Sequence, residues 1–262
     1  MKKSLFLLGG LCAAISLSAA DPDLLFEANF DNGSVTAAVA GGKAERKNFA
    51  NQTLDASKKI SGVNGKGGAA LLTAPEGCDY AAEGNFNAAQ GTVTVYVAAQ
   101  NWKPSTKTVQ VFFDALLSRE FRLLLYKNEY ANCFYALLTA ADAEGKTVNF
   151  QATSYITDDV WQTGKWHRLD VTWDSECLKL YVDGVQTPRN RWHISTRKFP
   201  NPMTFSNAIA GSAYIGIGTS PGWRRSASVH HGDATAFDLV RIWKRPLTAE
   251  EIKADHDKYM SR

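Results

Sequence analysis

The stretch HRLDVTWDSECLKLYVDG, residues 167–184, contains the clearest β-hairpin signal in the chain. Apolar residues alternate with polar ones over 167–173, and the same period of two returns over 178–182. Asp183 and Gly184 follow directly, and this pair tolerates the positive φ angles of a type I′ turn. The stretch therefore predicts two antiparallel strands followed by a tight return of the chain.

Segments with the same period recur along most of the chain, while helical periodicity is nearly absent. In the segment 92–98, valines at every second position make one face apolar and leave the other half-polar, as in a strand of a two-layer sheet. Residues 236–243 predict a last strand that is partly covered on both faces. The fold class expected is therefore all-β. The other predicted strands are residues 24–30, 69–72, 108–113, 121–126, 132–138 and 147–152.

One helix is predicted, close to the C-terminal end of the sequence. Thr248 and Glu251 have the spacing of a capping box, and Leu247 and Ile252 occupy the two positions of a hydrophobic staple. A cap of this kind contributes about 1 kcal/mol, which is enough to fix the residue at which a helix begins.

Residues 1–20 are typical of a secretory signal peptide. Lys2 and Lys3 precede an apolar run, and the run ends at Ser18-Ala19-Ala20, where small residues occupy the −3 and −1 positions of a cleavage site. No later segment approaches the roughly 20 apolar residues that a membrane span needs. We therefore expect a protein exported to the periplasm, the cell surface or the medium, starting at Asp21 and without membrane insertion once the signal is removed.

The charge balance argues against a nucleic-acid partner. The chain has 29 lysines and arginines and 26 aspartates and glutamates, which gives a formal charge of +3. Removal of Lys2 and Lys3 with the signal peptide lowers this value by two, to +1. A nearly neutral protein lacks the overall basic field that holds nucleic acid or an anionic membrane.

The order of these segments resembles the laminin G-like branch of the concanavalin A-like jelly-roll family, in its bacterial extracellular form. The resemblance extends over residues 24–258 and implies an antiparallel β-sandwich jelly roll with one short C-terminal helix, forming a single domain over 21–262. It rests on LFEANFD (25–31), GKGGAAL (65–71), GTVTVYV (91–97), GKWHRL (164–169), LKLYVDG (178–184), FDLVRIW (237–243) and LTAEEI (247–252).

Lectins, hydrolases, lyases and interaction modules all occur with this fold, so the function has to be inferred from individual residues. The Glu-x-Asp-x-x-Glu pattern, which would set the two carboxylates of a retaining glucanase on one strand face, is absent. We therefore expect a non-catalytic module that binds extracellular carbohydrate. A polysaccharide lyase or glycoside hydrolase, or an adhesion or scaffold protein that binds protein, are the alternatives. Lyase chemistry would draw on Gln110, Arg122, Tyr126, Tyr135 and Gln151.

Asp238 stands in the middle of an otherwise apolar strand, where a buried carboxylate needs a hydrogen bond or a cation. The family resemblance implies that this acid binds a structural calcium together with oxygens near Asp31 and Gly67. Calcium accepts carboxylate and carbonyl oxygens in loose geometry. The alternative is a carboxylate that accepts backbone amides or pairs with Arg241 or Arg46.

Two loops combine tryptophan with basic residues and lack strand periodicity. Indole faces stack on sugar rings, and arginine holds carboxylate or sulfate through paired hydrogen bonds. The alternative is that each loop folds back and buries its own tryptophan over the sandwich. The ligand-binding residues predicted on the first reading are Arg191 and Trp192 in one loop and Trp223 and Arg224 in the other; the oligomeric state stays open.

Overall fold

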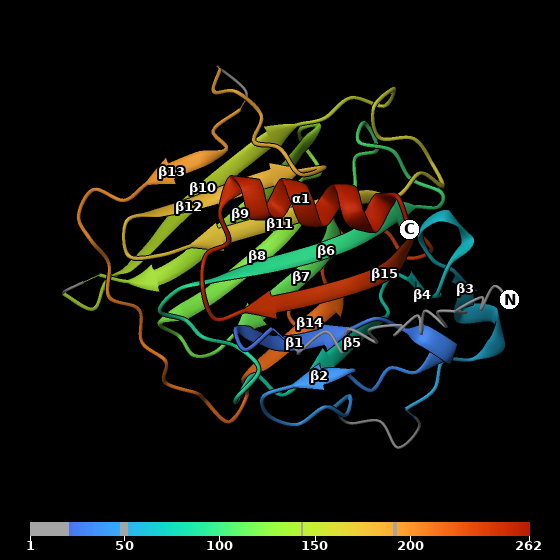
Figure 1. The fold of residues 1–262 in the computed structure, drawn as a ribbon. Helices are drawn as coiled ribbons and strands as arrows, with labels where there is room; N and C mark the ends of the chain where they lie inside the picture. The colour runs from blue at the N-terminus through green and yellow to red at the C-terminus, as the bar shows by residue number, and fades with distance from the viewer. Residues whose placement is uncertain (1–20, 48–51, 143, 191–192) are drawn as a thin grey trace, which may run out of the picture.

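The computed structural model describes residues 21–47, 52–142, 144–190 and 193–262. Two antiparallel sheets lie face to face, and a single α-helix of the described chain packs on the outside of one of them (Figure 1). The predicted all-β sandwich with one short C-terminal helix is confirmed. Three single-turn 3-10 helices are η1 (Asp31–Gly33), η2 (Ala56–Lys58) and η3 (Val63–Gly65).

The larger sheet has nine strands within the described residues. Its main path runs in the order β13-β12-β11-β6-β15-β1-β2, and β4 joins it through β15 and pairs in turn with β3. The bounds are β1 Leu24–Ala28, β2 Val39–Ala40, β3 Lys59–Ser61, β4 Gly68–Thr73, β6 Gly91–Ala99, β11 His167–Trp173, β12 Cys177–Val182, β13 Thr196–Lys198 and β15 Ala234–Trp243.

The smaller sheet has six described strands in the order β10-β9-β8-β7-β14-β5. The strands predicted from period-two segments are all present, whereas the two- or three-residue strands β2, β3 and β13 are too short to show a period. The bounds are β5 Gly77–Tyr80, β7 Gln110–Leu116, β8 Phe121–Lys127, β9 Cys133–Ala141, β10 Thr147–Tyr155 and β14 Tyr214–Gly218.

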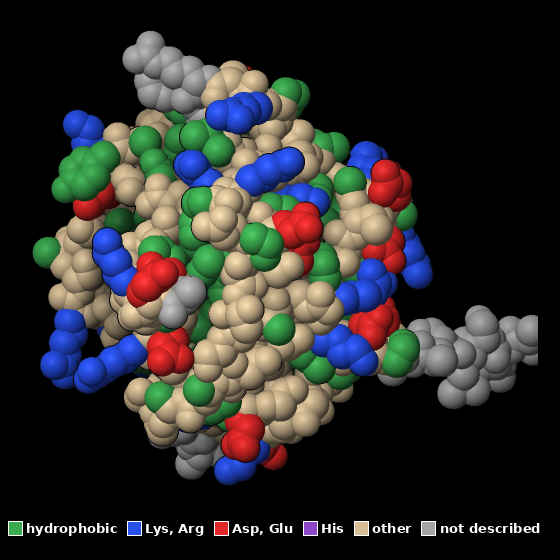
Figure 2. Space-filling model, turned by 90° about the vertical axis from the view of Figure 1, so that its left-hand side faces the viewer, with side chains coloured by type: hydrophobic (Ala, Val, Ile, Leu, Met, Phe, Trp, Pro, Cys, Tyr) green, Lys and Arg blue, Asp and Glu red, His purple; other side chains and the backbone are tan. Residues whose placement is uncertain are grey.

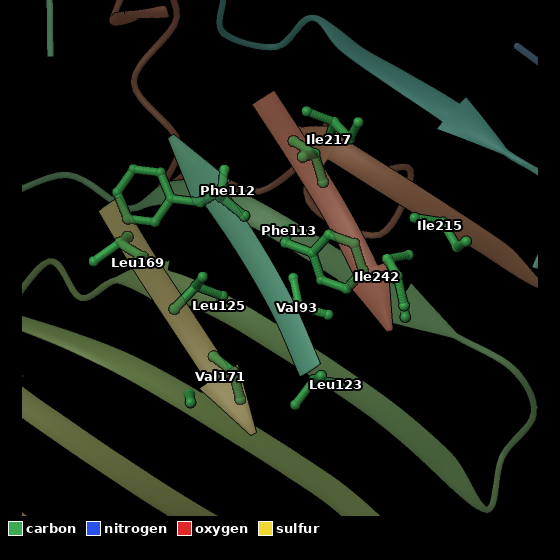
Figure 3. Packing of buried hydrophobic residues seen from close by; sticks show 14 of the residues in the cluster. Val93, Phe112, Phe113, Leu123, Leu125, Leu169, Val171, Ile215, Ile217 and Ile242 are labelled. Carbon is green, nitrogen blue, oxygen red and sulfur yellow. The ribbon is translucent and has the colours of Figure 1, made fainter. Parts of the chain in front are cut away.

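The core fills the space between the two sheets. Val93, Val171 and Ile242 from the larger sheet point toward Leu123 and Ile215 from the smaller one, and all five are fully buried (Figure 3). Alternate residues of each strand enter this core, because successive side chains of a strand point to opposite sides of a sheet. The residues between them are therefore left for the two outer faces.

The hairpin and the helix cap form as the sequence predicts. Asp183 and Gly184 have φ angles of 50° and 78°, and Val182 and Val185 form a bridge across this turn. The helix α1 spans Ala249–Met260, and Thr248 accepts a hydrogen bond from the Glu251 amide while the Glu251 carboxylate accepts one from the Thr248 amide. The capping box is thus confirmed.

The helix α1 covers the outside of the larger sheet. The Tyr259 ring lies 4.2 Å from the ring of Tyr96 in β6, and Ile252 packs with Tyr181 and Trp243. No described α-helix lies against the smaller sheet (Figure 1). On its outer face the segment around Trp223 and Val229 covers Leu124 and Tyr126, whereas the outer side chains of β10 stay exposed or half-buried.

Candidate functional site

The outer face of the six-stranded sheet, here called the open face, consists of the side chains that alternate with the core residues. Strand registers place them in rows across neighbouring strands, so that Tyr126 lies beside Tyr135 and Leu124 beside Leu137. The open face contains Asp114 and Leu116 of β7, Arg122, Leu124 and Tyr126 of β8, Tyr135, Leu137 and Thr139 of β9, and Asn149, Gln151 and Thr153 of β10.

Three aromatic rings form a stack across the open face. The Tyr126 ring lies 5.3 Å from the Tyr135 ring and 6.1 Å from the Trp223 ring, at interplanar angles of 28° and 29°. Tyr126 is buried between them, whereas Tyr135 and Trp223 are half-buried and keep part of their surface exposed. The loop with the predicted ligand residue Trp223 therefore folds back onto the sandwich and also adds an accessible aromatic surface to the open face.

A buried polar cluster holds this loop on the sheet. Arg122 donates to both oxygens of Asp114, at 2.8 and 2.6 Å, and the hydroxyl of Tyr214 donates to the same carboxylate at 2.9 Å. The Ser220 hydroxyl at the start of the loop also donates to Asp114. Burial and the nearby Asp114 charge raise the pKa of Tyr214 to about 12, so this phenol stays a donor at neutral pH.

Arg224, the other predicted ligand residue of this loop, is engaged with the protein. Its guanidinium contacts the Asp79 carboxylate at 2.6 Å and the Thr219 carbonyl at 3.2 Å. Burial raises the pKa of Asp79, and the charge of Arg224 opposes that rise. In this arrangement Arg224 anchors the loop that carries Trp223, and it also lines a surface hollow together with Arg46 and Lys58.

The remaining predicted residues fall into two groups. Arg191 and Trp192 lie outside the described residues. Of the side chains considered for lyase chemistry, Arg122, Tyr126, Tyr135 and Gln151 share the open face, but Gln110 instead donates to Thr108 and Asp233 at the end of β7. The predicted lyase group is therefore only partly assembled.

The structure brings the predicted calcium residues into one neighbourhood. Asp238 lies at a bulge of β15, and its carboxylate accepts from the Val63 amide at 2.8 Å and from Arg262 at 2.6 Å. Asp31 accepts from the Gly68 amide at 2.8 Å, next to Gly67. Burial raises the pKa of Asp238, while the hydrogen bond from Val63 and the Arg262 charge oppose the rise.

These contacts fit a calcium ion poorly. Calcium takes six to eight oxygen ligands, yet within the described residues no three His, Cys, Asp or Glu side chains gather as a metal-binding group. The guanidinium of Arg262, stacked 3.6 Å from the Tyr259 ring centre, already supplies a cation to Asp238. The arrangement corresponds to the alternative of a hydrogen-bonded, paired carboxylate, with Arg262 as the partner in place of Arg241 or Arg46.

Sequence reasoning missed the residues that organise the open face. Asp114 lies 100 residues from Tyr214 and 106 from Ser220, and no local pattern joins it to them. The stack of Tyr126 on Tyr135 had a usable signal, since both segments alternate with period two and both tyrosines fall on the polar side of their strands. The local sequence pattern does not show which strands become neighbours in the sheet.

Comparisons with known proteins agree with this architecture. A family model of the concanavalin A-like lectin/glucanases superfamily matches residues 76–253. No curated protein matches the chain. Among solved structures, domain 4 of AbnA, a GH43 extracellular arabinanase from Geobacillus stearothermophilus, in complex with arabinotriose, is 16% identical with a TM-score of 0.57. That alignment covers 88% of this chain and 97% of the domain.

Two toxin domains have the same fold. The binding domain of Paraclostridial Mosquitocidal Protein 1 has a TM-score of 0.59 and that of botulinum neurotoxin serotype D one of 0.56, each at 11% identity. Each alignment covers 90% of this chain but only 52% of the toxin domain. Identities this low show the fold alone.

The described helix is too short and too polar to cross a membrane, and none of the described residues form another candidate span. The two facing sheets, the jelly-roll strand order and the match over residues 76–253 agree with one another. The chain belongs to the concanavalin A-like lectin/glucanases superfamily.

Proposed function

We propose that this protein is an exported, non-catalytic module that binds a carbohydrate chain on the open face. The observation that carries the proposal is the stack of Tyr126, Tyr135 and Trp223 across that face. Sugar rings present apolar C–H surfaces that pack against aromatic faces, while the hydroxyl groups at their edges need polar partners. The half-buried rings of Tyr135 and Trp223 supply the first kind of contact.

Polar side chains next to the stack supply the second kind of contact. Gln151 and Asn149 of β10 are exposed, and Thr153 lies directly beside Tyr135 in the strand register. Rows of aromatic and amide side chains on a rigid sheet suit an extended ligand. A stack held by sheet registers also loses little entropy when a ligand binds, because its rings are already ordered.

The open face is poorly suited to acid–base catalysis. Asp114 is fully buried and both of its oxygens accept hydrogen bonds, from Arg122, Tyr214 and Ser220. Asp79 is also buried, and it is paired with Arg224. A general acid or base must reach the reacting oxygen of the substrate, and neither carboxylate is accessible for that role. This arrangement supports binding over hydrolysis.

A solved relative of the fold gives independent support. Domain 4 of AbnA was solved in complex with arabinotriose, so a domain with this fold holds a short sugar chain. We carry over to this chain only the class of ligand. Calcium is not part of this proposal, because Arg262 already pairs with the carboxylate of Asp238.

The test is binding of residues 21–262 to a glycan array that includes arabinotriose, followed by calorimetry with the strongest glycan. Tyr135→Ala should weaken binding roughly tenfold or more, as loss of an aromatic anchor does. Tyr130→Ala is the matched control, because Tyr130 is 88% exposed in a loop outside the open face. Equal affinity of both variants and the parent would contradict the proposal.

A further inference from the structure

A hollow lies at the edge of the sandwich, beside β13 and the segment that leads into it. Its volume is about 510 Å³, within the range of small-ligand sites. Hydrogen bonds from Gln186 to the Ser195 carbonyl and to Thr196 hold one wall. The Ser195 hydroxyl donates to the Thr187 carbonyl at 2.7 Å and closes the other side of the turn.

Among the residues that the structure describes, three cationic side chains and no acidic ones line the hollow. They are Arg189, Arg197 and Lys198. None of the ion pairs between described residues involves any of the three, whereas Arg122, Arg224 and Arg262 are each paired with a carboxylate. Figure 2, viewed from the side where β13 lies, shows Lys and Arg side chains gathered near the top of this face. The positive charge at the hollow is therefore uncompensated.

The hollow adjoins the open face. Ile194, which lines it, forms a bridge with Thr153 of β10, and Thr153 is the register neighbour of Tyr135. Tyr135 thus lies two strand spacings from Ile194, about 10 Å. Arg197 donates from Nε to the Gln151 carbonyl at 3.1 Å, which fixes its guanidinium beside the edge of β10.

We propose that this hollow is an anion subsite, so that the carbohydrate bound on the open face is an acidic polysaccharide carrying sulfate or carboxylate groups. The inference rests on the proposed function and specifies its ligand class. Uncompensated arginine and lysine side chains around a hollow favour an anion, and the two arginines offer the forked donors that carboxylate and sulfate accept.

The overall charge does not account for this patch. Without the signal peptide the formal charge is only +1, so three unpaired cations in one hollow represent a local concentration. A nearly neutral protein with one basic hollow beside an aromatic stack fits a ligand that alternates sugar faces with anionic groups. A protein that binds any polyanion would instead carry a basic field over its whole surface.

The experiment is calorimetry of residues 21–262 with chondroitin sulfate, with hyaluronan, which carries only carboxylates, and with neutral dextran. Arg189→Gln/Lys198→Gln removes two exposed charges and should weaken binding of the acidic polymers roughly tenfold. Arg197→Gln is the second variant. Lys66→Gln/Lys258→Gln, which removes two exposed charges elsewhere, should bind as the parent does.

The outcomes separate the two proposals. Binding of an acidic polymer that weakens in the double variant, in Tyr135→Ala and at high salt supports both. Binding of neutral glycans only, or an unchanged affinity of the double variant while Tyr135→Ala loses binding, overturns the anion subsite and leaves the glycan proposal standing. Loss in neither variant overturns both. Equally tight binding of a single-stranded oligonucleotide would reduce the hollow to a general polyanion contact.

Discussion

Replacement of Arg262 by methionine tests whether this arginine is the cation that Asp238 needs. The Asp238 side chain is 2% exposed, so the variant leaves a buried carboxylate without a cationic partner, with the Val63 amide and the Tyr259 hydroxyl as its remaining donors. Removal of one partner of a fully buried ion pair costs about 3–5 kcal/mol. The Arg262 side chain is 32% exposed, and solvent screening lowers the expected loss to about 2 kcal/mol.

The loss should depend on pH in a defined direction. Burial already holds the pKa of Asp238 above its ordinary value, and removal of the Arg262 charge raises it further. A folded-state pKa above the unfolded one means that the native protein binds the proton more tightly. The deficit of Arg262→Met is therefore complete at neutral pH and shrinks as the pH falls through the pKa of Asp238 in the folded state.

The assay is chemical denaturation of the parent and Arg262→Met with calcium and with a chelator. We expect neither calcium nor the chelator to change the stability of the parent protein. We expect calcium to stabilise Arg262→Met, by about 2.7 kcal/mol at 100 times the dissociation constant. Lys258→Met, an exposed position on α1, is the control. A parent that loses stability on chelation, or an Arg262→Met variant as stable as the parent, would refute the assignment of Arg262 as the native cation.

Three further predictions follow from the described contacts. Asp114→Asn should lower the free energy of unfolding by about 3 kcal/mol, because Arg122 loses its carboxylate partner. The same variant should speed amide exchange in the loop around Trp223, which mass spectrometry measures. Hydrogen bonding with Arg245 lowers the pKa of Glu251 to about 2. The ionised Glu251 carboxylate should therefore stabilise the folded protein by about 1 kcal/mol after screening above pH 4.5, and this contribution should disappear toward pH 2. Glu251→Gln should abolish this pH dependence in denaturation curves. N-terminal sequencing of exported protein should read Asp21 first, and soluble protein that retains residues 1–20 would overturn export.

The parts of the fold that depend on local pattern could be predicted from the sequence. The turn at Asp183 and Gly184 and the cap at Thr248 are decided by residues within a few positions of one another. The long strands are predicted by the alternation of apolar and polar residues. Short strands such as β13 could not be predicted, because pairing with β12 defines them more than their own three residues do.

The candidate site depends on long-range contacts and was predicted less well. The sequence identifies Trp223 as an aromatic residue in a basic loop. Its stacking on Tyr126 depends on the packing of this loop against β8, and no local sequence pattern indicates that packing. The ion pair of Arg224 with Asp79 joins residues that are 145 positions apart, and no local pattern indicates it. Electrostatic partners across such separations are set by the packed sandwich.

The most direct test of the glycan-binding face is a titration of residues 21–262 with the strongest glycan of the array, followed by backbone amide and indole NMR shifts. We predict that the shifts concentrate in β8, β9 and β10 and at the Trp223 indole. Shifts confined to the larger sheet and α1, with Tyr126, Tyr135 and Trp223 unaffected, would contradict it.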